Sequence, residues 1–282
     1  MQNKLAVVTG AAGGLGSELC KLIAAKGINL VFVDRNLEKS KTFATALNRQ
    51  YSGAVLDVFA ADLADHSSIK RLASELLAKY PVIHLLFNNA GVLTKTLQFS
   101  GHGNELHFEV NTLAPLQLID LLRPSLKNAN GAVVVSTSAG LSLRAKNLNW
   151  NELLRPTTFK KLYGPYVNSK EALNVITAAL APELAGNNII IRAADPGPNQ
   201  TGLTKGKGTP LWMRLFYWAL PTPDKGAQRI LDPALSTKWG NQSGIFVSNG
   251  KIRSLPQALA DKAFQKEFLA KCRSRAALTK VE

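Results

Sequence analysis

Short apolar runs alternate with longer amphipathic segments along the whole chain, and this alternation constrains the fold more than any other feature. The apolar runs have the length of buried strands, and the segments between them have the helical period. Strands separated by helix-length connections indicate βαβ units and a mostly parallel sheet. The predicted strands are Leu5–Thr9, Asn29–Asp34, Ala54–Ala60, Val82–Asn88, Ala132–Thr137, Ile189–Ala194 and Gly244–Ser248, and the predicted helices span 15–26, 37–48, 66–79, 103–126, 165–186, 224–236 and 256–276.

The fold class that follows is α/β, with a single doubly wound parallel sheet of Rossmann type and helices on both faces. No repeat or linker divides the 282 residues, so we expect one domain over residues 1–282. Met1–Lys4 is too short for a signal peptide, and no run approaches the roughly 20 apolar residues of a membrane span. We therefore expect a cytoplasmic protein.

The chain is strongly basic, with 34 Lys and Arg against 19 Asp and Glu and a formal net charge of +15. Such a balance nominates nucleic acid, an anionic membrane or an acidic ligand as a partner. No groove-reading motif or basic–aromatic interleaving accompanies it, so we expect no nucleic acid partner. The two cysteines and four histidines show no ligand spacing, and we expect no metal site and no catalytic histidine.

A glycine-rich turn, Gly10-Ala-Ala-Gly13-Gly14-Leu15-Gly16, joins the first predicted strand to the first predicted helix. Glycines allow a tight turn and let the backbone approach a pyrophosphate, which lies at the helix N-terminus. We therefore predict that Gly10, Gly14, Leu15 and Gly16 bind a dinucleotide cofactor. A purely structural strand-to-helix turn is the alternative.

The second predicted strand ends at Asp34, which is followed by Arg35. A carboxylate at this place accepts hydrogen bonds from both hydroxyls of an adenosine ribose and repels a 2′-phosphate, which favours NAD. An arginine beside the same hydroxyl can instead bind the phosphate of NADP. We assign Asp34 and Arg35 to the cofactor site and predict NAD, with NADP as the alternative.

Tyr166 and Lys170 stand at the head of a predicted helix, where positions i and i+4 share one face. Because a neighbouring cation stabilises phenolate, Lys170 is expected to lower the pKa of Tyr166. Pro165 suits the first helical position, so the helix dipole is expected to add to this effect. Ser138 follows a buried strand and can donate a hydrogen bond to a substrate carbonyl. A surface Tyr–Lys pair is the structural alternative.

With these residues the chain resembles the short-chain dehydrogenase/reductase family. The matching motifs occur in family order over residues 9–201: Thr9-Gly10-x-x-x-Gly14-x-Gly16, Asp62-Leu63, Asn88-Asn89-Ala90-Gly91, Asn111, Ser138, Tyr166-x-x-x-Lys170 and Pro196-Gly197. The resemblance implies hydride transfer between a nicotinamide and an alcohol or carbonyl carbon. It implies the catalytic residues Asn111, Ser138, Tyr166 and Lys170, and the further cofactor-binding residues Asp62, Leu63, Asn89, Ala90, Gly91, Pro196, Gly197 and Thr201, with Tyr166 and Lys170 also touching the cofactor. A non-catalytic NAD(P)-binding sensor or scaffold is the alternative function.

The long connection Arg144–Tyr163 and the segment that follows Thr201 resemble those of retinol-dehydrogenase-like members, which prefer NADP. Within 198–225, the run Leu211–Leu220 is apolar nearly all round and is expected to form a lid over an apolar alcohol or ketone. A membrane-surface anchor is the alternative, which would make the protein membrane-peripheral. The connection before the tyrosine covers a surface that family tetramers use, so we expect a homodimer or monomer.

Overall fold

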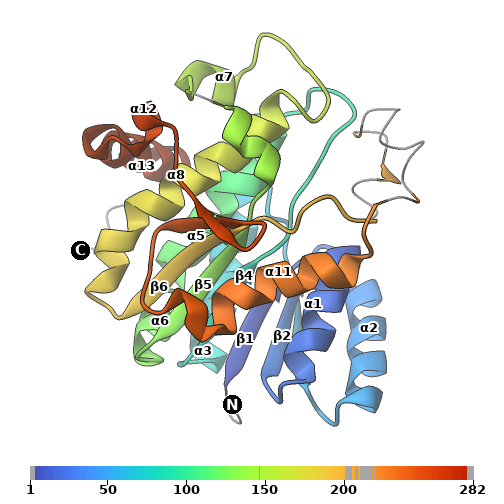
Figure 1. Cartoon of the computed structure of the whole chain (residues 1–282). Helices are drawn as coiled ribbons and strands as arrows, with labels where there is room; N and C mark the ends of the chain where they lie inside the picture. The colour runs from blue at the N-terminus through green and yellow to red at the C-terminus, as the bar shows by residue number, and fades with distance from the viewer. Residues whose placement is uncertain are drawn as a thin grey trace.

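The structure, a computed structural model, describes residues 4–145, 147–200, 205, 206, 209, 218 and 220–277. These residues form one eight-stranded sheet with the order β3-β2-β1-β4-β5-β6-β7-β8 (Figure 1). Strands β1 to β7 run parallel, and β8 pairs with β7 in the antiparallel direction. The α/β class with a doubly wound sheet is thereby confirmed. The strands are β1 (Leu5–Thr9), β2 (Asn29–Asp34), β3 (Val55–Ala60), β4 (Leu85–Asn88), β5 (Ala132–Thr137), β6 (Ile189–Ala194), β7 (Ile245–Ser248) and β8 (Lys251–Arg253).

All seven predicted strands are present, but the edge strand β8 was not predicted. Asn249 and Gly250, between β7 and β8, both have positive φ, at 52° and 67°. A two-residue type I′ hairpin turn requires this conformation, and Asn-Gly is its strongest sequence signal. β4 begins at Leu85 instead of Val82; of the two apolar residues before it, Ile83 is buried and Val82 is half-buried.

Two layers of helices cover the two faces of the sheet, and each layer has its own apolar core. Alternate residues of β1 divide between them: Leu5 and Val7 belong to one core, and Ala6 and Val8 to the other. The first core is closed by α3 (His66–Lys79), α5 (Ala114–Leu121) and α8 (Pro165–Ala185), and the second by α1 (Gly14–Ala24), α2 (Leu37–Gln50) and α11 (Pro223–Leu235). Helices α1, α2 and α11 lie on the near face in Figure 1.

The helix predicted over 103–126 is not continuous. It consists of α4 (Leu106–Phe108), a π-helical turn η1 (Glu109–Leu113) and α5, and α6 (Arg123–Asn128) follows. The π turn carries Asn111, and such turns are frequent at functional sites. The apolar period continues through the change of helix type, so the sequence pattern does not reveal it.

The connection before α8 and the C-terminal helices form an additional layer beside the first core. The connection contains the 3-10 turn η2 (Gly140–Arg144) and α7 (Trp150–Leu154), and the predicted helix 256–276 is divided into α12 (Gln257–Ala260) and α13 (Lys262–Arg275). Trp150 packs edge-on against Phe108 and Phe268, each at 5.9 Å between ring centroids. This aromatic contact attaches the connection to α13, which itself packs on α8 and α5.

The segment expected to act as a lid lies largely outside the described residues. Of the run Leu211–Leu220, the structure describes Trp218, which is 75% exposed, and Leu220. Among the helices that the structure describes, none is both long and apolar enough to cross a membrane.

Candidate active site

A cavity of about 1020 Å³ lies at the carboxyl edge of the parallel strands, where a doubly wound sheet is expected to bind its ligand. Residues that follow β1, β2, β4, β5 and β6 form much of its wall. The structure brings together in this wall most of the predicted site residues: Gly10, Gly14, Leu15, Gly16, Asp34, Arg35, Asp62, Leu63, Asn89, Ala90, Gly91, Ser138, Tyr166, Lys170, Pro196 and Gly197. The predicted cofactor contact Thr201 lies outside the described residues.

Backbone contacts shape the glycine turn and leave no room for a side chain at Gly10 or Gly16. Gly10 has a φ of +68°, and a Cβ there would lie 3.0 Å from Cα of Ala90. A Cβ on Gly16 would lie 2.0 Å from the carbonyl oxygen of Gly10. Helix α1 begins at Gly14, after the N-cap residue Gly13, and no side chain of the described residues caps it. The N–H groups at this helix start are therefore accessible to a phosphate.

Asp34 lies beside the glycine turn and holds it in place. Its Oδ2 accepts hydrogen bonds from the backbone N–H of Ala12 at 3.0 Å and from the hydroxyl of Ser40 at 2.6 Å. Burial raises the pKa of Asp34, and both hydrogen bonds oppose that rise. The exposed side chains of Arg35 and Lys39 also line the cavity. This end of the cavity thus combines an acid suited to ribose hydroxyls with cations suited to a phosphate.

Thr9 and Asn89 hold the ends of β1 and β4 together next to the glycine turn. Oγ1 of Thr9 accepts hydrogen bonds from the backbone N–H groups of Asn89 and Ala90, both at 3.0 Å. The amide of Asn89 donates in return to the carbonyl oxygen of Thr9 at 3.1 Å. Asp62 stabilises the turn after β3, where its Oδ1 accepts from the N–H of Ala64 at 2.9 Å. Asn89 and Asp62 therefore support the backbone of the wall that they line.

Tyr166 and Lys170 lie in the first turns of α8, which begins at Pro165 as predicted. Both side chains are buried and both line the cavity. Nζ of Lys170 donates a 2.7 Å hydrogen bond to the carbonyl oxygen of Thr137, the last residue of β5. The hydroxyl of Ser138 donates to the carbonyl oxygen of Lys170 at 3.3 Å. The three predicted catalytic side chains therefore meet where the end of β5 packs on α8.

The prediction that Lys170 lowers the pKa of Tyr166 is wrong. Burial raises the pKa of Tyr166, and the nearby carboxylate of Asp195 adds to the rise. Burial also lowers the pKa of Lys170 to about 7, because the ammonium is removed from water. Tyr166 is therefore a protonated phenol at neutral pH.

Asn111 lies behind the cavity wall and shapes a loop that lines it. Its Oδ1 accepts from the N–H of Val92 at 2.9 Å, and its Nδ2 donates to the carbonyl oxygen of Val92 at 3.2 Å and to Oγ of Ser169 at 3.1 Å. A Cβ on Gly91 would lie 3.1 Å from Oδ1 of Asn111 and 3.6 Å from Nζ of Lys170. Asn111 thus does not line the cavity itself but contacts Gly91 and Val92, which do.

Pro196 and Gly197 follow β6 and are held by Asp195. The N–H of Gly197 donates to Oδ1 of Asp195 at 2.8 Å, and the hydroxyl of Ser248 donates to Oδ2 at 2.8 Å. Gly197 has a φ of +72°, and a Cβ there would lie 2.1 Å from Nη1 of Arg229. The positive φ explains why glycine follows the proline in the wall, since the flexible end of Arg229 could move aside.

Sequence reasoning missed Asp195 and the apolar part of the wall. Asp195 is a buried carboxylate directly after β6, and the carboxyl-edge argument that selected Asp34 could have found it. The apolar residues come from the connections between β4 and η1 and between β5 and α8, including α4 and η2: Leu93, Phe99, Leu106, Leu141 and Leu162. They give the cavity wall an apolar part.

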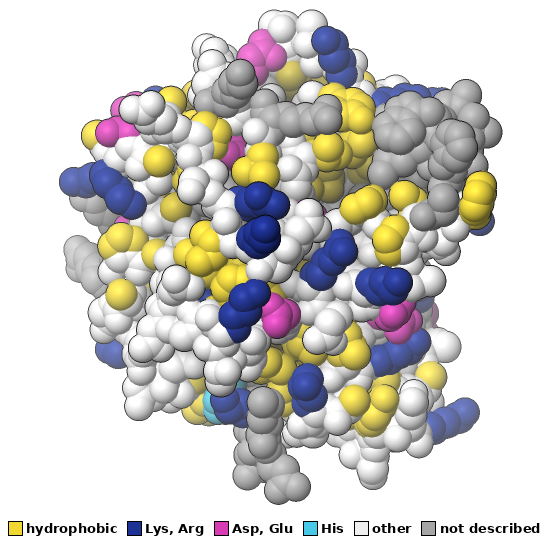
Figure 2. Space-filling model, in the orientation of Figure 1, with side chains coloured by type: hydrophobic (Ala, Val, Ile, Leu, Met, Phe, Trp, Pro, Cys, Tyr) yellow, Lys and Arg dark blue, Asp and Glu magenta, His cyan; other side chains and the backbone are white. Residues whose placement is uncertain are grey.

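The positive charge of the chain is dispersed on the face that Figure 2 shows. Among the described side chains there, Lys and Arg lie scattered between hydrophobic and uncharged groups. A protein that follows a nucleic acid backbone instead gathers its cations into a patch or stripe. On this face the described Lys and Arg side chains form no single patch or stripe.

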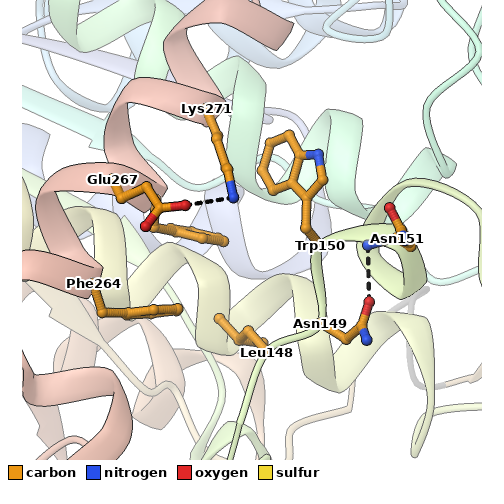
Figure 3. A pocket seen from close by; sticks show the side chains of 8 residues that line it. Leu148, Asn149, Trp150, Asn151, Phe264, Glu267 and Lys271 are labelled. Carbon is orange, nitrogen blue, oxygen red and sulfur yellow. Dashed lines mark hydrogen bonds and ion pairs between the residues drawn. The ribbon is translucent and has the colours of Figure 1, made fainter.

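A second hollow, of about 420 Å³, lies between α7 and α13 (Figure 3). Glu267 and Lys271 form a 2.6 Å ion pair beside it, and Trp150 faces them from the other side. Its lining contains no glycine turn and no tyrosine among the described residues: Leu148, Asn149, Trp150, Asn151, Phe264, Glu267, Phe268 and Lys271. The larger cavity is therefore the candidate active site.

Comparison with known proteins supports the resemblance to short-chain dehydrogenases. The sequence model of a family described as short chain dehydrogenase matches residues 4–150. The chain is 31% identical over 250 residues to retinol dehydrogenase 11 of Homo sapiens, and the alignment covers 88% of this chain and 78% of that protein. It is 28% identical over 258 residues to polyprenol dehydrogenase of Homo sapiens, with coverage of 88% and 78%.

Two solved structures have a similar fold. A crystal structure of an uncharacterized protein from Mycobacterium paratuberculosis has a TM-score of 0.77 at 24% identity and covers 98% of this chain and 94% of its own. The 3-ketoacyl-(acyl-carrier-protein) reductase from Brucella melitensis, complexed with NADH, has a TM-score of 0.67 at 22% identity, with coverage of 88% and 98%. At these identities the likeness concerns the fold alone.

Proposed function

Because the chain belongs to the short-chain dehydrogenase/reductase family of NAD(P)-dependent enzymes, we propose that it interconverts a lipophilic alcohol and its carbonyl compound. Tyr166 is the proton donor in reduction and the acceptor in oxidation. The observation that carries the proposal is that Tyr166, Lys170 and Ser138 share one cavity with an uncapped glycine turn. That combination supports a reaction in which acid–base groups act beside a bound dinucleotide.

The residues present fit a nicotinamide dinucleotide. The cavity exceeds the usual size of a small-ligand pocket, which reaches roughly 1,000 Å³. The start of α1 would hold the pyrophosphate, and Asp34 would accept hydrogen bonds from the adenosine ribose. Lys170 would hold the nicotinamide ribose. When bound, the nicotinamide supplies or accepts the hydride.

Ser138 and Tyr166 act on the substrate oxygen. The hydroxyl of Ser138 donates a long, weak hydrogen bond of 3.3 Å to the carbonyl oxygen of Lys170. Breaking this bond costs little free energy, so the hydroxyl can rotate and donate to a substrate carbonyl oxygen. Tyr166 donates its phenolic proton to the same oxygen as negative charge develops there.

The apolar wall and the relatives support a lipophilic substrate. Leu93, Leu141 and Leu162 line the wall and pack in one apolar cluster with Tyr166. The relatives named retinol dehydrogenase and polyprenol dehydrogenase are named for long apolar alcohols. We therefore propose a primary or secondary alcohol with an extended hydrocarbon part, or the corresponding aldehyde or ketone.

A panel of alcohols and carbonyl compounds of increasing chain length tests this function. We expect turnover, followed by the absorbance of the reduced nicotinamide, with kcat/KM rising by about three- to fourfold per buried methylene. Equal rates for short polar and long apolar compounds would contradict the lipophilic assignment. Absence of turnover with every compound, despite cofactor binding, would contradict the function itself.

Replacing Asp34 tests the proposed preference for NAD. Wild-type protein should bind NAD more tightly than NADP, and Asp34→Ala should weaken NAD binding by about tenfold or more, since a charged hydrogen bond contributes roughly 1.5–3 kcal/mol. Asp34→Asn removes the negative charge but keeps an amide oxygen that can still accept from the N–H of Ala12. This variant therefore measures the effect of the charge on affinity without the loss of the contact with the glycine turn. Binding is measured by titration calorimetry.

The matched control is Glu38→Ala, which removes an exposed carboxylate of α2 that pairs with Lys41. It should leave both affinities unchanged. A wild-type protein that binds NADP more tightly than NAD would show that Arg35 and Lys39 outweigh Asp34.

A further inference from the structure

His107 is buried directly against the phenol ring of Tyr166. It is 1% exposed, and the two ring centroids are 6.0 Å apart at an interplanar angle of 80°. This is an edge-to-face contact within the range at which aromatic pairs attract. The imidazole therefore forms part of the support on which the proposed proton donor rests.

Hydrogen bonds on both ring nitrogens hold this imidazole in one orientation. Nδ1 lies 2.5 Å from Oε1 of Glu105, and Nε2 accepts the backbone N–H of Thr94 at 3.0 Å. Because a backbone N–H can only donate, Nε2 carries no proton, and the network assigns the neutral tautomer with its proton on Nδ1. Glu105 is itself fixed, since its Oε2 accepts from the N–H of Phe108 at 3.0 Å and caps α4.

His107 and Asn111, one helical turn apart, hold the same loop. His107 binds the N–H of Thr94, and Asn111 binds both backbone groups of Val92. Val92 and Leu93 line the cavity. A displacement of the His107 ring would therefore move the support of Tyr166 and the neighbouring cavity wall together.

If the side chain at position 107 only filled space in the core, an apolar residue would serve there without a buried carboxylate beside it. Glu105 is completely buried, and a buried carboxylate is costly unless it is paired and hydrogen-bonded. Glu105 lies next to His107, which packs on the proposed proton donor Tyr166, so the free-energy cost of burying this carboxylate falls beside the reacting group. We propose that His107, oriented by Glu105, is a positioning residue for Tyr166 and for the loop Val92–Thr94. The inference rests on the proposed function, in which Tyr166 moves the proton.

Four variants test the inference in the full-length protein. His107→Phe keeps an aromatic ring against Tyr166 but removes both hydrogen bonds. His107→Gln keeps an amide that can accept from Thr94 and donate to Glu105. Glu105→Gln removes the carboxylate that orients the imidazole. The control is His84→Phe, at the amino edge of the sheet, where the imidazole accepts the N–H of Leu5 at 3.1 Å.

We expect His107→Phe to lower kcat by about 10- to 100-fold, because a misplacement of about 1 Å has an effect of this size. The cofactor Kd should change by less than about twofold, because the glycine turn and Asp34 are unaltered, whereas KM should rise, because Val92 and Leu93 line the cavity. The solvent deuterium isotope effect on kcat should increase, because proton transfer becomes slower. His107→Gln should recover most of the rate, and Glu105→Gln should lower kcat in the same direction with an increased isotope effect.

Three results would overturn the positioning role: an unchanged kcat in His107→Phe, a loss of kcat in His84→Phe of the same size, or a loss without any change of the isotope effect. If His107→Phe fails to fold, Glu105→Gln decides alone, and an unchanged kcat in it overturns the role. Wild-type turnover is measured in parallel. Its absence would contradict the proposed function, whereas its presence with an unaffected His107→Phe contradicts only this inference.

Discussion

Tyr166→Phe should lower kcat by about 10²- to 10⁴-fold, the usual contribution of a positioned acid–base group. The substitution removes one hydroxyl and leaves the ring in its contacts with His107 and with the small apolar cluster around it. The cofactor Kd should therefore change little. Steady-state kinetics and calorimetric titration of the cofactor measure the two effects separately.

The matched control for this variant is Tyr51→Phe, which removes a phenolic hydroxyl at the end of α2, away from the cavity wall. It should retain wild-type kcat. Turnover within tenfold of wild type in Tyr166→Phe would show that another group moves the proton. Loss of cofactor binding along with activity would instead assign Tyr166 a role in holding the dinucleotide.

Gly16→Ala should weaken cofactor binding by about 10- to 100-fold, because overpacking of this kind costs typically 1–3 kcal/mol. The added Cβ would lie 2.0 Å from the carbonyl oxygen of Gly10, so one of them must move. That carbonyl also accepts the N–H of Gly13 at 3.1 Å and the amide of Asn89 at 3.4 Å. Its displacement therefore distorts the turn that would receive the pyrophosphate.

Gly186→Ala is the control for this substitution. Gly186 ends α8 with a φ of −62°, and a Cβ there meets no described atom within 4 Å. The control should bind cofactor as wild type does, and thermal unfolding of both variants shows whether Gly16→Ala also lowers stability. Wild-type affinity in Gly16→Ala would mean that the turn adjusts freely and does not cradle the phosphates.

Local sequence patterns were sufficient to predict most of the fold. The strand Leu5–Thr9 appears with the predicted bounds because a short apolar run followed by glycine has few other solutions. Pro165 begins α8 as predicted, since proline fixes the backbone angle that a helix start needs. The π turn at Glu109–Leu113 could not be predicted, because one extra residue in a turn leaves the apolar spacing nearly unchanged.

The electrostatics of the site depended on burial, which spacing along the chain does not report. Tyr166 and Lys170 are four residues apart, and that spacing suggested a lowered tyrosine pKa. In the structure both groups are withdrawn from water, and the carboxylate of Asp195, distant in sequence, adds to the rise in the pKa of Tyr166. The same limit applies to His107, which shows no ligand spacing and yet packs on Tyr166 from another helix.

The sequence by itself determined where the strands lie along the chain and where the glycine turn falls, and it predicted the groups able to move a proton, because these depend on local periodicity and on residue types at short spacing. Only the tertiary structure decided which of these groups share a cavity, and it placed Asn111 behind Gly91 and His107 behind Tyr166. It also decided the charge states at the site. The physical reason is that desolvation and hydrogen bonding are set by neighbours that are far apart in the chain.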